Sequence, residues 1–599
     1  MENTKTNDNI TKISQVTPEV TLFLRNLGLS NYYIIKIFAL VGEAAIVLTE
    51  DNPYWLLEEF PSMKFEKADK VASALGVEKN DFYRIQSAIK HGLSLYVSRG
   101  NTFVQARGFC VQIGQFLELS SETIEDVMED MALSGDLQLT VLNGQEVLYF
   151  YGYYKTECQV VSKMAEMAEK TPAPIGANMD AIIAKAESQK GITLSEQQKE
   201  AVKNSLSHSV SIITGGPGTG KTTIINTLIQ IMEEGGLKVA VAAPTGRAAK
   251  RITQTSGKIA LTVHRLLEYY YDEEGRQMAF GRNQANPLDY DAVIVDETSM
   301  MDLMLMGTLS RALKENSRLI LTGDADQLPS VGAGNVLGDF IESGYIYTSR
   351  LTEIFRQAEE SKIVLNAHRI NRGEYPEYGE DFIIVEADKQ QEILEKITKI
   401  AVQWPLENVQ VLTPTKNGVL GSQNLNQHLQ KIFNPSDESK EELEFGNKIY
   451  RCGDRVMQIK NNYQLEYRKK EGGTGKGIFN GETGTVTAVH KDDKKTVVCY
   501  DDDRWVEYPY TQLEEIELAY AVTVHKSQGS EFPVVIIPMS WFPPALATRN
   551  LLYTAVTRGK NQVVIVGRGD YLNAMIDNVQ VGKRNSGLKT RLKGMYEGI

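Results

Sequence analysis

Continuous apolar segments alternate with amphipathic segments over the central part of the chain. The strand-like apolar runs are SVSIIT, KVAVAAP, AVIVDE and SRLILTGD, and TTIINTLIQIMEE between the first two has helical spacing. Strands that are apolar along their whole length are typical of a parallel sheet covered by helices. A second section with the same alternation begins near Tyr347, includes VQVLTPTK and ends with VVIVGR. The pattern therefore predicts an α/β fold with a buried parallel sheet.

The N-terminal part of the chain has a helical pattern instead. From Val20 to about Leu93, short apolar runs are broken by single glycines, of which Gly28 and Gly76 each lie between two apolar residues. A glycine in that position suits the turn of a helix-hairpin-helix motif, whose backbone amides can hold a DNA phosphate. A plain bundle of short helices is the alternative, and the residues alone leave both open.

Changes of pattern mark further boundaries. EKTPAPIGANMD is rich in proline and small residues and indicates a linker, and the glycine-punctuated β pattern after Tyr450 predicts a small SH3-like barrel inserted into the second α/β section. The predicted division is a disordered tail at 1–16, a helix-hairpin-helix-type region at 17–98, a small winged-helix-like linking domain at 99–170, α/β domains at 171–346 and at 347–449 with 514–599, and the β insert at 450–513.

Composition narrows the class of protein. The 599 residues are 42% apolar and 24% charged, as in soluble globular proteins, and 77 acidic against 64 basic residues give a net charge of −13. This balance argues against coating DNA through bulk positive charge, but it leaves a local basic groove open. The four cysteines have no CxxC spacing, the first residues form no secretory signal, and no uninterrupted apolar run approaches the length of a membrane span. We therefore expect a cytoplasmic protein with no membrane partner.

The strongest chemical motif is a phosphate-binding loop. Gly215–Thr222 reads GGPGTGKT, a full match to GxxxxGK[ST] between an apolar strand and a helix. Backbone N–H groups of such a loop curl around phosphates, Lys221 would neutralise the β- and γ-phosphates of ATP, and Thr222 would bind Mg²⁺. The predicted nucleotide-contacting residues are Gly215, Gly216, Pro217, Gly218, Thr219, Gly220, Lys221, Thr222 and Thr223. GGTGKG at Gly472–Gly477 lacks the hydroxyl residue after its lysine and indicates a flexible loop.

Polar residues at the ends of two later strands complete the predicted site. Asp296 in AVIVDE could bind the water shell of Mg²⁺, and Glu297 could orient the attacking water. Gln327 in LTGDADQLP lies where a γ-phosphate sensor is expected. Gln198 in LSEQQKEAV could hydrogen-bond an adenine edge, and an ordinary position on a helix surface is its alternative.

Nine segments occur in the order found in superfamily-1 helicases, and the chain resembles that family. They are QQKEAV, GGPGTGKT, APTGRAA, TVHRLL, VDETSM, GDADQLP, EIFRQ, TVHKSQGSEF and YTAVTRGK. TVHRLL, GDADQLPSVGAG and VLTPTKNGVLG resemble the RecD-like branch, and the N-terminal ADKVASALG section resembles its stand-alone members rather than the RecD subunit of the RecBCD nuclease. Those members usually have a further N-terminal domain, which we expect this chain to lack.

The resemblance implies two RecA-like motor domains with ATP between them and 5′→3′ movement along single-stranded DNA. Arg356 in EIFRQ and Arg558 in YTAVTRGK would then stabilise charge on the γ-phosphate. The segment 266–289 would form the pin that separates strands, with aromatic side chains able to stack on an end base pair; an ordinary surface hairpin is the alternative. The β insert would lie over the DNA as a lid.

The resemblance also implies DNA contacts on both motor domains, mostly through hydroxyl and amide groups that suit sequence-independent phosphate binding. A structural role is the alternative for each; His264, for example, could be a core histidine bonded to a backbone carbonyl. The residues are Thr245, Arg247, Thr262, His264, Thr413, Thr523, His525 and Lys526.

The leading hypothesis is an ATP-dependent DNA helicase that acts on single-stranded and forked DNA, in repair, recombination or mobile-element processing. An RNA-directed translocase and a DNA-junction binding module are the alternatives. The intact set of Lys221, Asp296, Glu297 and Arg558 argues against the binding module. The sequence indicates no nuclease constellation and no particular protein partner.

Overall fold

The computed structural model describes residues 16–60, 63–272, 277–354, 360–438, 440–470, 472–501, 503–579 and 584–597. The predicted tail at 1–16 lies outside the described residues except for Val16. By the contacts within the chain, residues 1–155 with 585–587 form one compact unit and the remainder forms a second.

The first unit begins with helices. They are α2 (Pro18–Asn26), α3 (Asn31–Val41), α4 (Ala45–Asp51), α5 (Trp55–Glu59), α6 (Phe65–Ala74) and α7 (Phe82–Ser98). Gly28, between α2 and α3, and Gly76, between α6 and α7, have φ values of +80° and +82°, which only glycine adopts without strain. Asp81 accepts a hydrogen bond from the Arg84 N–H and caps α7.

The rest of this unit is a small mixed domain. Helices α8 (Ala106–Leu117) and α9 (Ser121–Leu133) accompany an antiparallel sheet in the order β1-β3-β2, formed by β1 (Phe103–Gln105), β2 (Leu137–Leu142) and β3 (Gln145–Phe150). Side chains from both parts of the unit share one hydrophobic core, from Val16 to Leu148. Helix α10 (Tyr151–Glu169) follows β3.

A 21-residue stretch, Asn31–Asp51, is apolar enough on average to cross a membrane, although Lys36 and Glu43 interrupt it. The structure breaks it midway, because α3 ends at Val41 and a short 3-10 turn precedes α4. A helix that spans a bilayer must satisfy its backbone hydrogen bonds along its whole length. Because of the break, this stretch forms two short helices in place of one continuous helix.

The first α/β domain of the second unit is built on a six-stranded sheet in the order β11-β4-β10-β9-β5-β6. All of its neighbouring strands are parallel. The strands are β4 (Val210–Gly215), β5 (Val239–Ala243), β6 (Leu261–Thr262), β9 (Ala292–Val295), β10 (Arg318–Gly323) and β11 (Tyr347–Leu351). Its helices are α11 (Met179–Lys190), α12 (Glu196–Ser207), α13 (Lys221–Glu234), α14 (Gly246–Ser256), α15 (Val263–Leu266), α16 (Leu303–Ala312) and α17 (Val336–Ser343). The carboxyl ends of β4, β9 and β10 meet at one edge, which positions the predicted motifs together.

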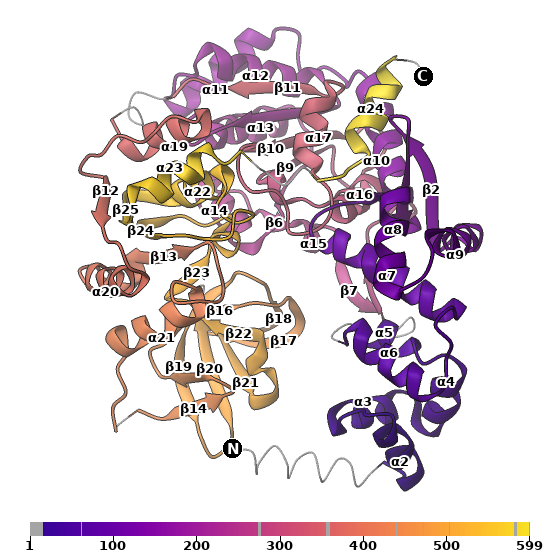
Figure 1. Cartoon of the computed structure of the whole chain (residues 1–599). Coiled ribbons are helices and arrows are strands. Elements are labelled where there is room, and N and C mark those ends of the chain that lie inside the picture. Colours follow the sequence, from indigo (N-terminus) through magenta and orange to yellow (C-terminus); the bar gives the residue numbers. More distant parts are fainter. Residues whose placement is uncertain are drawn as a thin grey trace. The chain divides into compact units, whose positions relative to one another are not determined.

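The second α/β domain has a five-stranded sheet in the order β12-β25-β24-β13-β23, again parallel throughout. Figure 1 shows α20 on one side of this sheet and α22 and α23 on the other. The strands are β12 (Phe382–Glu386), β13 (Val409–Thr413), β23 (Ala521–Thr523), β24 (Phe532–Met539) and β25 (Gly559–Gly567). The helices are α19 (Lys362–Arg372), α20 (Gln390–Ala401), α21 (Ser422–Phe433), α22 (Arg549–Val556) and α23 (Gly569–Asp577), and α24 (Leu588–Glu597) packs on α17.

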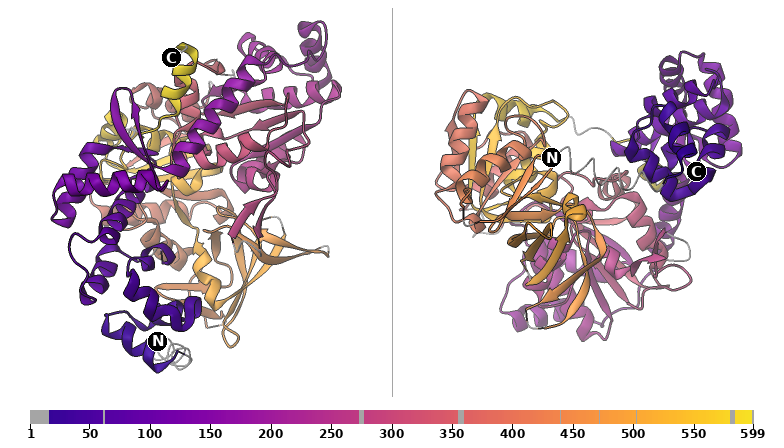
Figure 2. Two further views of the ribbon diagram at one scale, coloured as in Figure 1. Left: turned by 90° about the vertical axis from the view of Figure 1, so that its right-hand side faces the viewer. Right: turned by 90° about the horizontal axis from the view of Figure 1, so that it is seen from below.

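An antiparallel insert separates β13 from β23. Its seven-stranded sheet has the order β18-β17-β21-β20-β19-β16-β22, beside a hairpin of β14 (Glu442–Phe445) and β15 (Lys448–Arg451). The strands are β16 (Arg455–Gln458), β17 (Asn462–Lys469), β18 (Thr474–Ile478), β19 (Thr483–His490), β20 (Lys495–Tyr500), β21 (Arg504–Pro509) and β22 (Ile516–Leu518). Figure 2 shows this twisted sheet from two further directions. Gly472–Gly477, which the sequence indicates is a flexible loop, is partly strand, because β18 pairs with β17.

A second, smaller hairpin lies in the segment 266–289, where β7 (Tyr269–Asp272) pairs with β8 (Gln277–Phe280).

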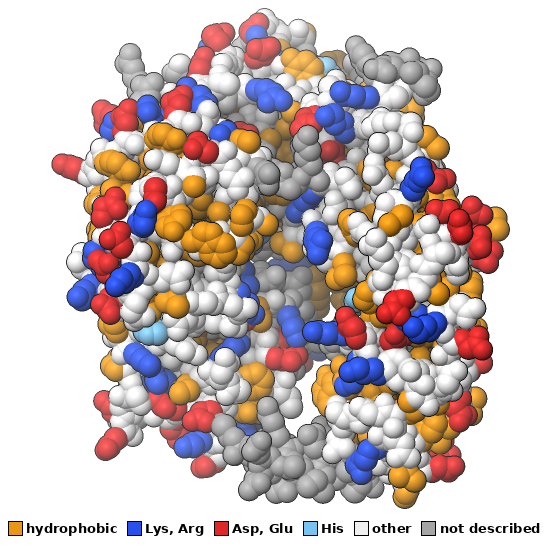
Figure 3. All heavy atoms as spheres, viewed as in Figure 1, with side chains coloured by type: hydrophobic (Ala, Val, Ile, Leu, Met, Phe, Trp, Pro, Cys, Tyr) orange, Lys and Arg blue, Asp and Glu red, His pale blue; other side chains and the backbone are white. Residues whose placement is uncertain are grey.

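On the face shown in Figure 3, Lys and Arg side chains are interspersed with Asp and Glu. No single sign of charge dominates that face, as the small net charge relative to the number of ionisable residues leads one to expect.

Candidate functional site

The phosphate loop follows β4 directly and ends where α13 begins at Lys221. Gly218 and Gly220 have φ values of +75° and +82°, so the loop turns through conformations that favour glycine. A Cβ atom on Gly216 would lie 2.8 Å from Cε1 of His368 and 3.1 Å from the hydroxyl of Tyr553. The second α/β domain therefore approaches the loop too closely for any side chain at position 216.

Side chains of the loop hold its shape from within. Lys221 Nζ donates to the carbonyl oxygens of Gly215 and Gly216, the latter at 2.9 Å, and Thr219 Oγ1 donates to the Gly216 carbonyl at 2.9 Å. His368 of α19 contacts the Pro217 carbonyl at 3.2 Å. The lysine ammonium thus lies at the mouth of the loop, where the phosphates of a nucleotide are expected.

Gln198 fastens α12 to this loop. Its backbone N–H and side-chain oxygen form a capping box with Ser195, and its Nε2 donates to the Thr219 carbonyl at 3.0 Å. The residue is only 2% exposed, so its alternative as a helix-surface residue is wrong. Its role at an adenine edge stays a prediction.

One cavity of about 650 Å³ brings most of the predicted catalytic residues together. Its walls come from both α/β domains, because Glu531, Thr557 and Arg558 face the phosphate loop. Gly215 and Gln198 do not line it, and Arg356 lies outside the described residues. The sequence-predicted residues that do line it are Gly216, Pro217, Gly218, Thr219, Gly220, Lys221, Thr222, Thr223, Asp296, Glu297, Gln327 and Arg558.

Glu297 is held in an unusual backbone conformation, with φ +54° in the left-handed region. Burial raises the pKa of its carboxyl, and the positive charges of Arg558 and Lys221 act in the opposite direction. Its neighbour Asp296 accepts a hydrogen bond from the hydroxyl of Thr322. Two adjacent carboxylates thus have different surroundings, one hydrogen-bonded and one desolvated, which suits different roles.

Arg558 is 2% exposed although it carries a permanent charge. Its guanidinium donates to Oε1 of Gln327 and to the backbone carbonyls of Thr554 (3.2 Å) and Ser530 (3.3 Å). A buried arginine held in this way is preorganised to meet negative charge that develops in the cavity.

Two residues that the sequence reasoning missed extend this network. Gln327 Nε2 donates to Asp324 at 3.2 Å, and the Tyr553 hydroxyl donates to the same carboxylate at 2.6 Å. Asp324 lies in GDADQLP and Tyr553 in YTAVTRGK, so both stand in segments that the sequence already singled out. Only the fold shows that these two segments meet.

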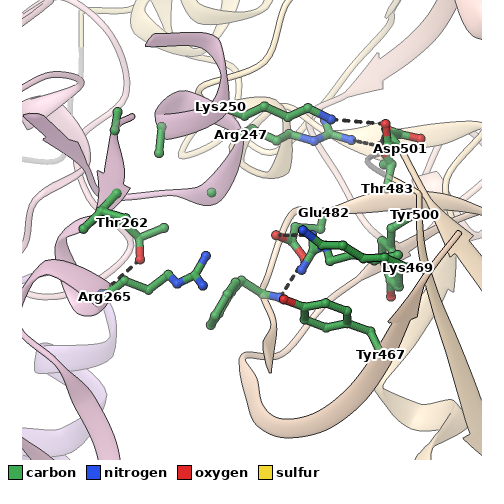
Figure 4. Close-up of a pocket in the computed structure, with 16 residues that line it drawn as sticks. Arg247, Lys250, Thr262, Arg265, Tyr467, Lys469, Glu482, Thr483, Tyr500 and Asp501 are labelled. Atoms are coloured by element: carbon green, nitrogen blue, oxygen red, sulfur yellow. Dashed lines mark hydrogen bonds and ion pairs between the residues drawn. The ribbon is translucent and has the colours of Figure 1, made fainter. Parts of the chain in front are cut away.

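A second cavity, of about 370 Å³, lies between α14 and α15 of the first α/β domain and the β insert (Figure 4). Its lining is basic and aromatic, a combination that suits single-stranded nucleic acid. It includes Arg247, Lys250, Thr262, Arg265, Tyr467, Lys469, Phe479, Tyr500 and Arg504, with Glu482 and Asp501 as the acidic members. Of these, sequence reasoning found Arg247 and Thr262; the residues of the insert carry no motif that would have shown them.

Four family models match successive parts of the chain. The family model for the "ATP-dependent RecD2 DNA helicase HHH domain" matches residues 14–103, and the "ATP-dependent RecD-like DNA helicase SH3 domain" matches 425–500. An "AAA domain" matches 198–333 and a "UvrD-like helicase C-terminal domain" 518–566. The ATP-dependent RecD2 DNA helicase of Deinococcus radiodurans is 32% identical over 555 residues, which cover 91% of this chain and 74% of that protein. The chain belongs to the RecD2 family of DNA helicases.

One further relative and one solved structure are similar to parts of the chain. The RecBCD enzyme subunit RecD of Mycolicibacterium smegmatis is 31% identical over 66% of this chain and 75% of its own length. A solved structure of Pif1 helicases at forked DNA aligns with 21% identity and a TM-score of 0.40, over 65% of this chain and 94% of that one.

Membership of the RecD2 family settles three sequence-based predictions. The chain is an ATP-dependent DNA helicase, and its fold joins a helix-hairpin-helix region, a RecA-like motor and an SH3-like insert, as predicted. The helices after residue 17 are therefore a helix-hairpin-helix region and not a plain bundle. The SH3 match begins at residue 425, inside α21, and the insert's sheet continues through β22, so the insert is longer than the pattern at 450–513 indicates.

In this RecD2-family chain, several residues predicted to touch DNA instead bind protein groups. Thr413 is fully buried and its hydroxyl donates to the Leu420 carbonyl at 2.6 Å. Arg247 donates to the hydroxyls of Ser530 (2.7 Å) and Thr483 (2.6 Å). The structure therefore contradicts a direct DNA contact for the Thr413 side chain, and it gives the Arg247 guanidinium protein partners.

The remaining predicted DNA contacts have mixed surroundings. Thr245 and Thr262 accept capping hydrogen bonds at the starts of α14 and α15, and Lys526 pairs with Glu517 at 2.7 Å. His525 is half-buried, and burial together with the charge of Arg584 lowers its pKa. Thr523 lines a small recess beside Lys526.

His264 packs against the rings of Tyr269 and Phe280, with centroids 5.4 and 6.1 Å away, and burial lowers its pKa. His264 therefore supports the hairpin β7–β8 through ring contacts. This differs from the alternative given for it, which was a core histidine bonded to a backbone carbonyl. Tyr269 also touches Tyr463 of the insert at a centroid distance of 4.8 Å. The next two residues, Tyr270 and Tyr271, are 49% and 44% exposed.

Proposed function

We propose that this helicase couples ATP hydrolysis between two motor domains to 5′→3′ movement on single-stranded DNA and to the opening of forked duplexes. Residues 171–346 form one motor domain, and 347–449 with 514–599 form the other, apart from β14, β15 and β22, which belong with the insert. The single observation that carries the proposal is the shared cavity, in which Lys221 of one domain and Arg558 of the other face the same space. A site completed by both domains changes when they separate, so chemistry in it can drive their movement.

The hydrolysis step follows from the groups around the cavity. Lys221 and the backbone N–H groups of the loop bind the β- and γ-phosphates, and Glu297 orients a water molecule and accepts its proton as the water oxygen attacks the γ-phosphorus. The bond from phosphorus to the β,γ-bridging oxygen breaks, leaving ADP and inorganic phosphate. Arg558 stabilises the negative charge on the γ-oxygens, and Gln327, bonded to Arg558, responds to loss of the phosphate.

Mg²⁺ fits two of the oxygen donors that line the cavity. Thr222 offers a hydroxyl and Asp296 a carboxylate, and hard oxygen donors of this kind, together with phosphate oxygens and water, are those that Mg²⁺ prefers. When bound, the ion neutralises charge on the β- and γ-phosphates. Thr222 and Asp296 are therefore the residues that would hold it, and Gln198 would hydrogen-bond an adenine edge of the nucleotide.

The nucleic-acid path is proposed along the predicted contacts other than Thr413 and Arg247, whose side chains bind protein groups. These are Thr245, Thr262 and His264 in the first motor domain and Thr523, His525 and Lys526 in the second. The hairpin β7–β8 would act as the pin, since Tyr270 and Tyr271 expose aromatic rings that can stack on the last base pair. Action in DNA repair or recombination, in the cytoplasm, completes the proposal.

Strand displacement tests the proposal directly. The chain should separate a duplex with a 5′ single-stranded tail when ATP and Mg²⁺ are present, and it should leave a 3′-tailed duplex paired. Lys221→Ala should abolish both displacement and single-strand-stimulated hydrolysis, because it removes the phosphate-neutralising charge. Preference for the 3′-tailed duplex would overturn the polarity, and equal stimulation by RNA would favour the RNA-directed alternative. ATP turnover that ignores added DNA would overturn the motor mechanism.

A further inference from the structure

Helix α14 presents two arginines to the second motor domain. Arg247 and Arg251 are four residues apart, so both lie on one face of the helix. Their partners are adjacent in the sequence: Arg247 binds Ser530, and Arg251 binds Glu531. The two contacts therefore hold one short segment that follows TVHKSQG and precedes β24.

Arg251 belongs to the nucleotide cavity. It lines the wall together with its partner Glu531, which lies across from it in the second motor domain. The positive charge of Arg251 reaches Glu297, where it opposes the rise in pKa that burial causes. Arg251 is thus a third cation at the catalytic carboxylate beside Lys221 and Arg558, and the sequence motifs did not indicate it.

Glu531 forms an ion pair with Arg251, but a second cation shares its carboxylate. Its second oxygen lies 3.0 Å from Nζ of Lys560, and the side chains of Arg251 and Glu531 are 42% and 21% exposed. An exposed ion pair in water contributes little stability, so it exchanges easily. Phosphate groups bind guanidinium through charge-assisted and often bidentate hydrogen bonds, and a γ-phosphate brings more charge than one carboxylate.

Arg247 reaches the other cavity from the same helix. Its guanidinium spans Ser530 and Thr483, the first residue of β19 in the insert, and burial lowers its pKa to about 10. Figure 4 shows Arg247 and the neighbouring Lys250 extending from α14 toward Thr483 and Asp501. Lys250 Nζ donates to the Asp501 carbonyl at 3.2 Å. Movement of the segment 530–531 would therefore act on the contact between α14 and the insert.

We propose that Arg251 binds the γ-phosphate of ATP, that Glu531 is its partner when no triphosphate is bound, and that the exchange is passed through Ser530 and Arg247 to the insert. This inference rests on the proposed hydrolysis in the same cavity. It adds a phosphate-contacting residue and a route from that residue to the basic, aromatic cavity beside the insert.

Binding of two nucleotides tests the first half of this inference. For the full-length chain, the dissociation constants of Mg²⁺ with a non-hydrolysable ATP analogue and with ADP are measured by calorimetry. Arg251→Ala should weaken the analogue about tenfold or more and ADP by less than about twofold, because only the analogue has a γ-phosphate. Glu531→Gln should tighten the analogue several-fold, because it removes the competing carboxylate. Arg568→Ala is the matched control, because this exposed arginine pairs with Asp570 and lines neither cavity, and it should change neither constant.

Each other result counts against the inference. Equal losses for both nucleotides in Arg251→Ala would make Arg251 a structural residue, and weaker binding of both nucleotides by Glu531→Gln would assign that carboxylate to the nucleoside. Retained ADP affinity shows that each variant is folded. DNA-stimulated hydrolysis by the unmodified chain checks the proposed function separately. If this hydrolysis is absent, the motor mechanism fails. If it is present and Arg251→Ala binds the ATP analogue as tightly as the unmodified chain does, only the present inference fails.

Affinity for single-stranded DNA tests the second half of the inference, which is the route from the nucleotide cavity to the insert. The ratio of the dissociation constants for an oligothymidylate, with and without the ATP analogue, measures the coupling between the two cavities. Thr483→Val removes the hydroxyl that Arg247 binds and should bring this ratio toward one without changing analogue affinity in the absence of DNA. An unchanged ratio in Thr483→Val would overturn the route through Arg247.

Discussion

Arg558 donates a hydrogen bond to the side-chain oxygen of Gln327, and both residues line the cavity that contains Lys221. Gln327 follows β10 of the first motor domain, whereas Arg558 follows α22 of the second. The residue proposed to report the γ-phosphate is therefore joined to the residue that completes the cavity from the opposite domain. Separation of the domains would break this hydrogen bond and remove the guanidinium from the cavity.

Replacement of Arg558 should affect turnover more than binding. Arg558→Ala should lower kcat for DNA-stimulated hydrolysis by about 10³-fold, because the guanidinium stabilises charge that develops only during phosphoryl transfer. Arg558→Lys should restore little, since a lysine lacks the planar fork that binds Gln327. Steady-state kinetics with saturating single-stranded DNA measure this effect. Arg568→Ala, at an exposed arginine paired with Asp570, is the control, and a kcat for Arg558→Ala near that of the control would contradict the prediction.

The buried carboxyl of Glu297 should make both activity and stability depend on pH. Its raised pKa means that the folded protein binds a proton there more readily than the unfolded chain, so this group stabilises the fold increasingly as pH falls from its folded pKa toward its unfolded value. Hydrolysis, which needs the carboxylate, should decline over the same interval. Glu297→Gln should abolish most hydrolysis and raise the Tm at neutral pH, by about 1–3 °C, with the difference narrowing in acid.

Thermal unfolding between pH 5 and pH 8 measures this effect. Glu514→Gln, at a side chain that is 61% exposed and paired only at the surface with Lys460, is the matched control. A Glu297→Gln variant that melts below the unmodified chain at neutral pH would show that this carboxylate contributes favourably to the fold.

Glu517 should affect the pH dependence of stability in the opposite way to Glu297. Hydrogen bonds from Lys526 and Lys416 overcome the effect of burial and lower its pKa to about 2. A lowered pKa contributes stability that is present above the unfolded value and is lost as pH falls toward about 2. Glu517→Gln should therefore lower the free energy of unfolding at neutral pH, by about 1–3 kcal/mol after allowance for partial exposure, and this effect should shrink as pH falls toward about 2. Denaturant titration at several pH values measures this, and an effect that does not depend on pH would exclude the ion pairs as its cause.

The exposed rings of the hairpin should serve strand separation rather than hydrolysis. Tyr270→Ala with Tyr271→Ala removes two rings that can stack on a base pair, so duplex separation should slow several-fold while single-strand-stimulated hydrolysis is retained. Comparison of the two rates in one preparation isolates the effect. Tyr347→Ala, at an equally exposed tyrosine on β11, is the control; equal loss in the control variant would remove the special role of the hairpin.

Local patterns were enough to predict the motor core. Continuous apolar strands identify parallel sheets, and GGPGTGKT contains both the glycines and the charge that a phosphate loop needs, so Lys221 and Asp296 could be found without coordinates. The two glycines between apolar residues left a helix-hairpin-helix and a plain bundle both open, and the family comparison shows the former.

Long-range contacts could not be predicted in the same way. Arg251 forms its ion pair with a residue far along the chain, and nothing in the local sequence distinguishes it from any other basic residue on an exposed helix face. Thr413 shows the reverse error, because a hydroxyl at a strand end looks available for a phosphate until its hydrogen bond to Leu420 is seen. Which polar groups satisfy one another depends on tertiary structure, and motif order does not encode it.

The way in which the insert joins the second motor domain has a mechanical consequence. Its last strand, β22, ends at Leu518, and β23 at the edge of the motor sheet begins at Ala521. Only Ala519 and Tyr520 lie between them; both are buried, and the Tyr520 hydroxyl donates to Asp454 at 2.8 Å. The two-residue junction is short and buried. A twisting force that a duplex applies to the insert would therefore be transmitted to the edge strand β23, which leads to Thr523 and His525.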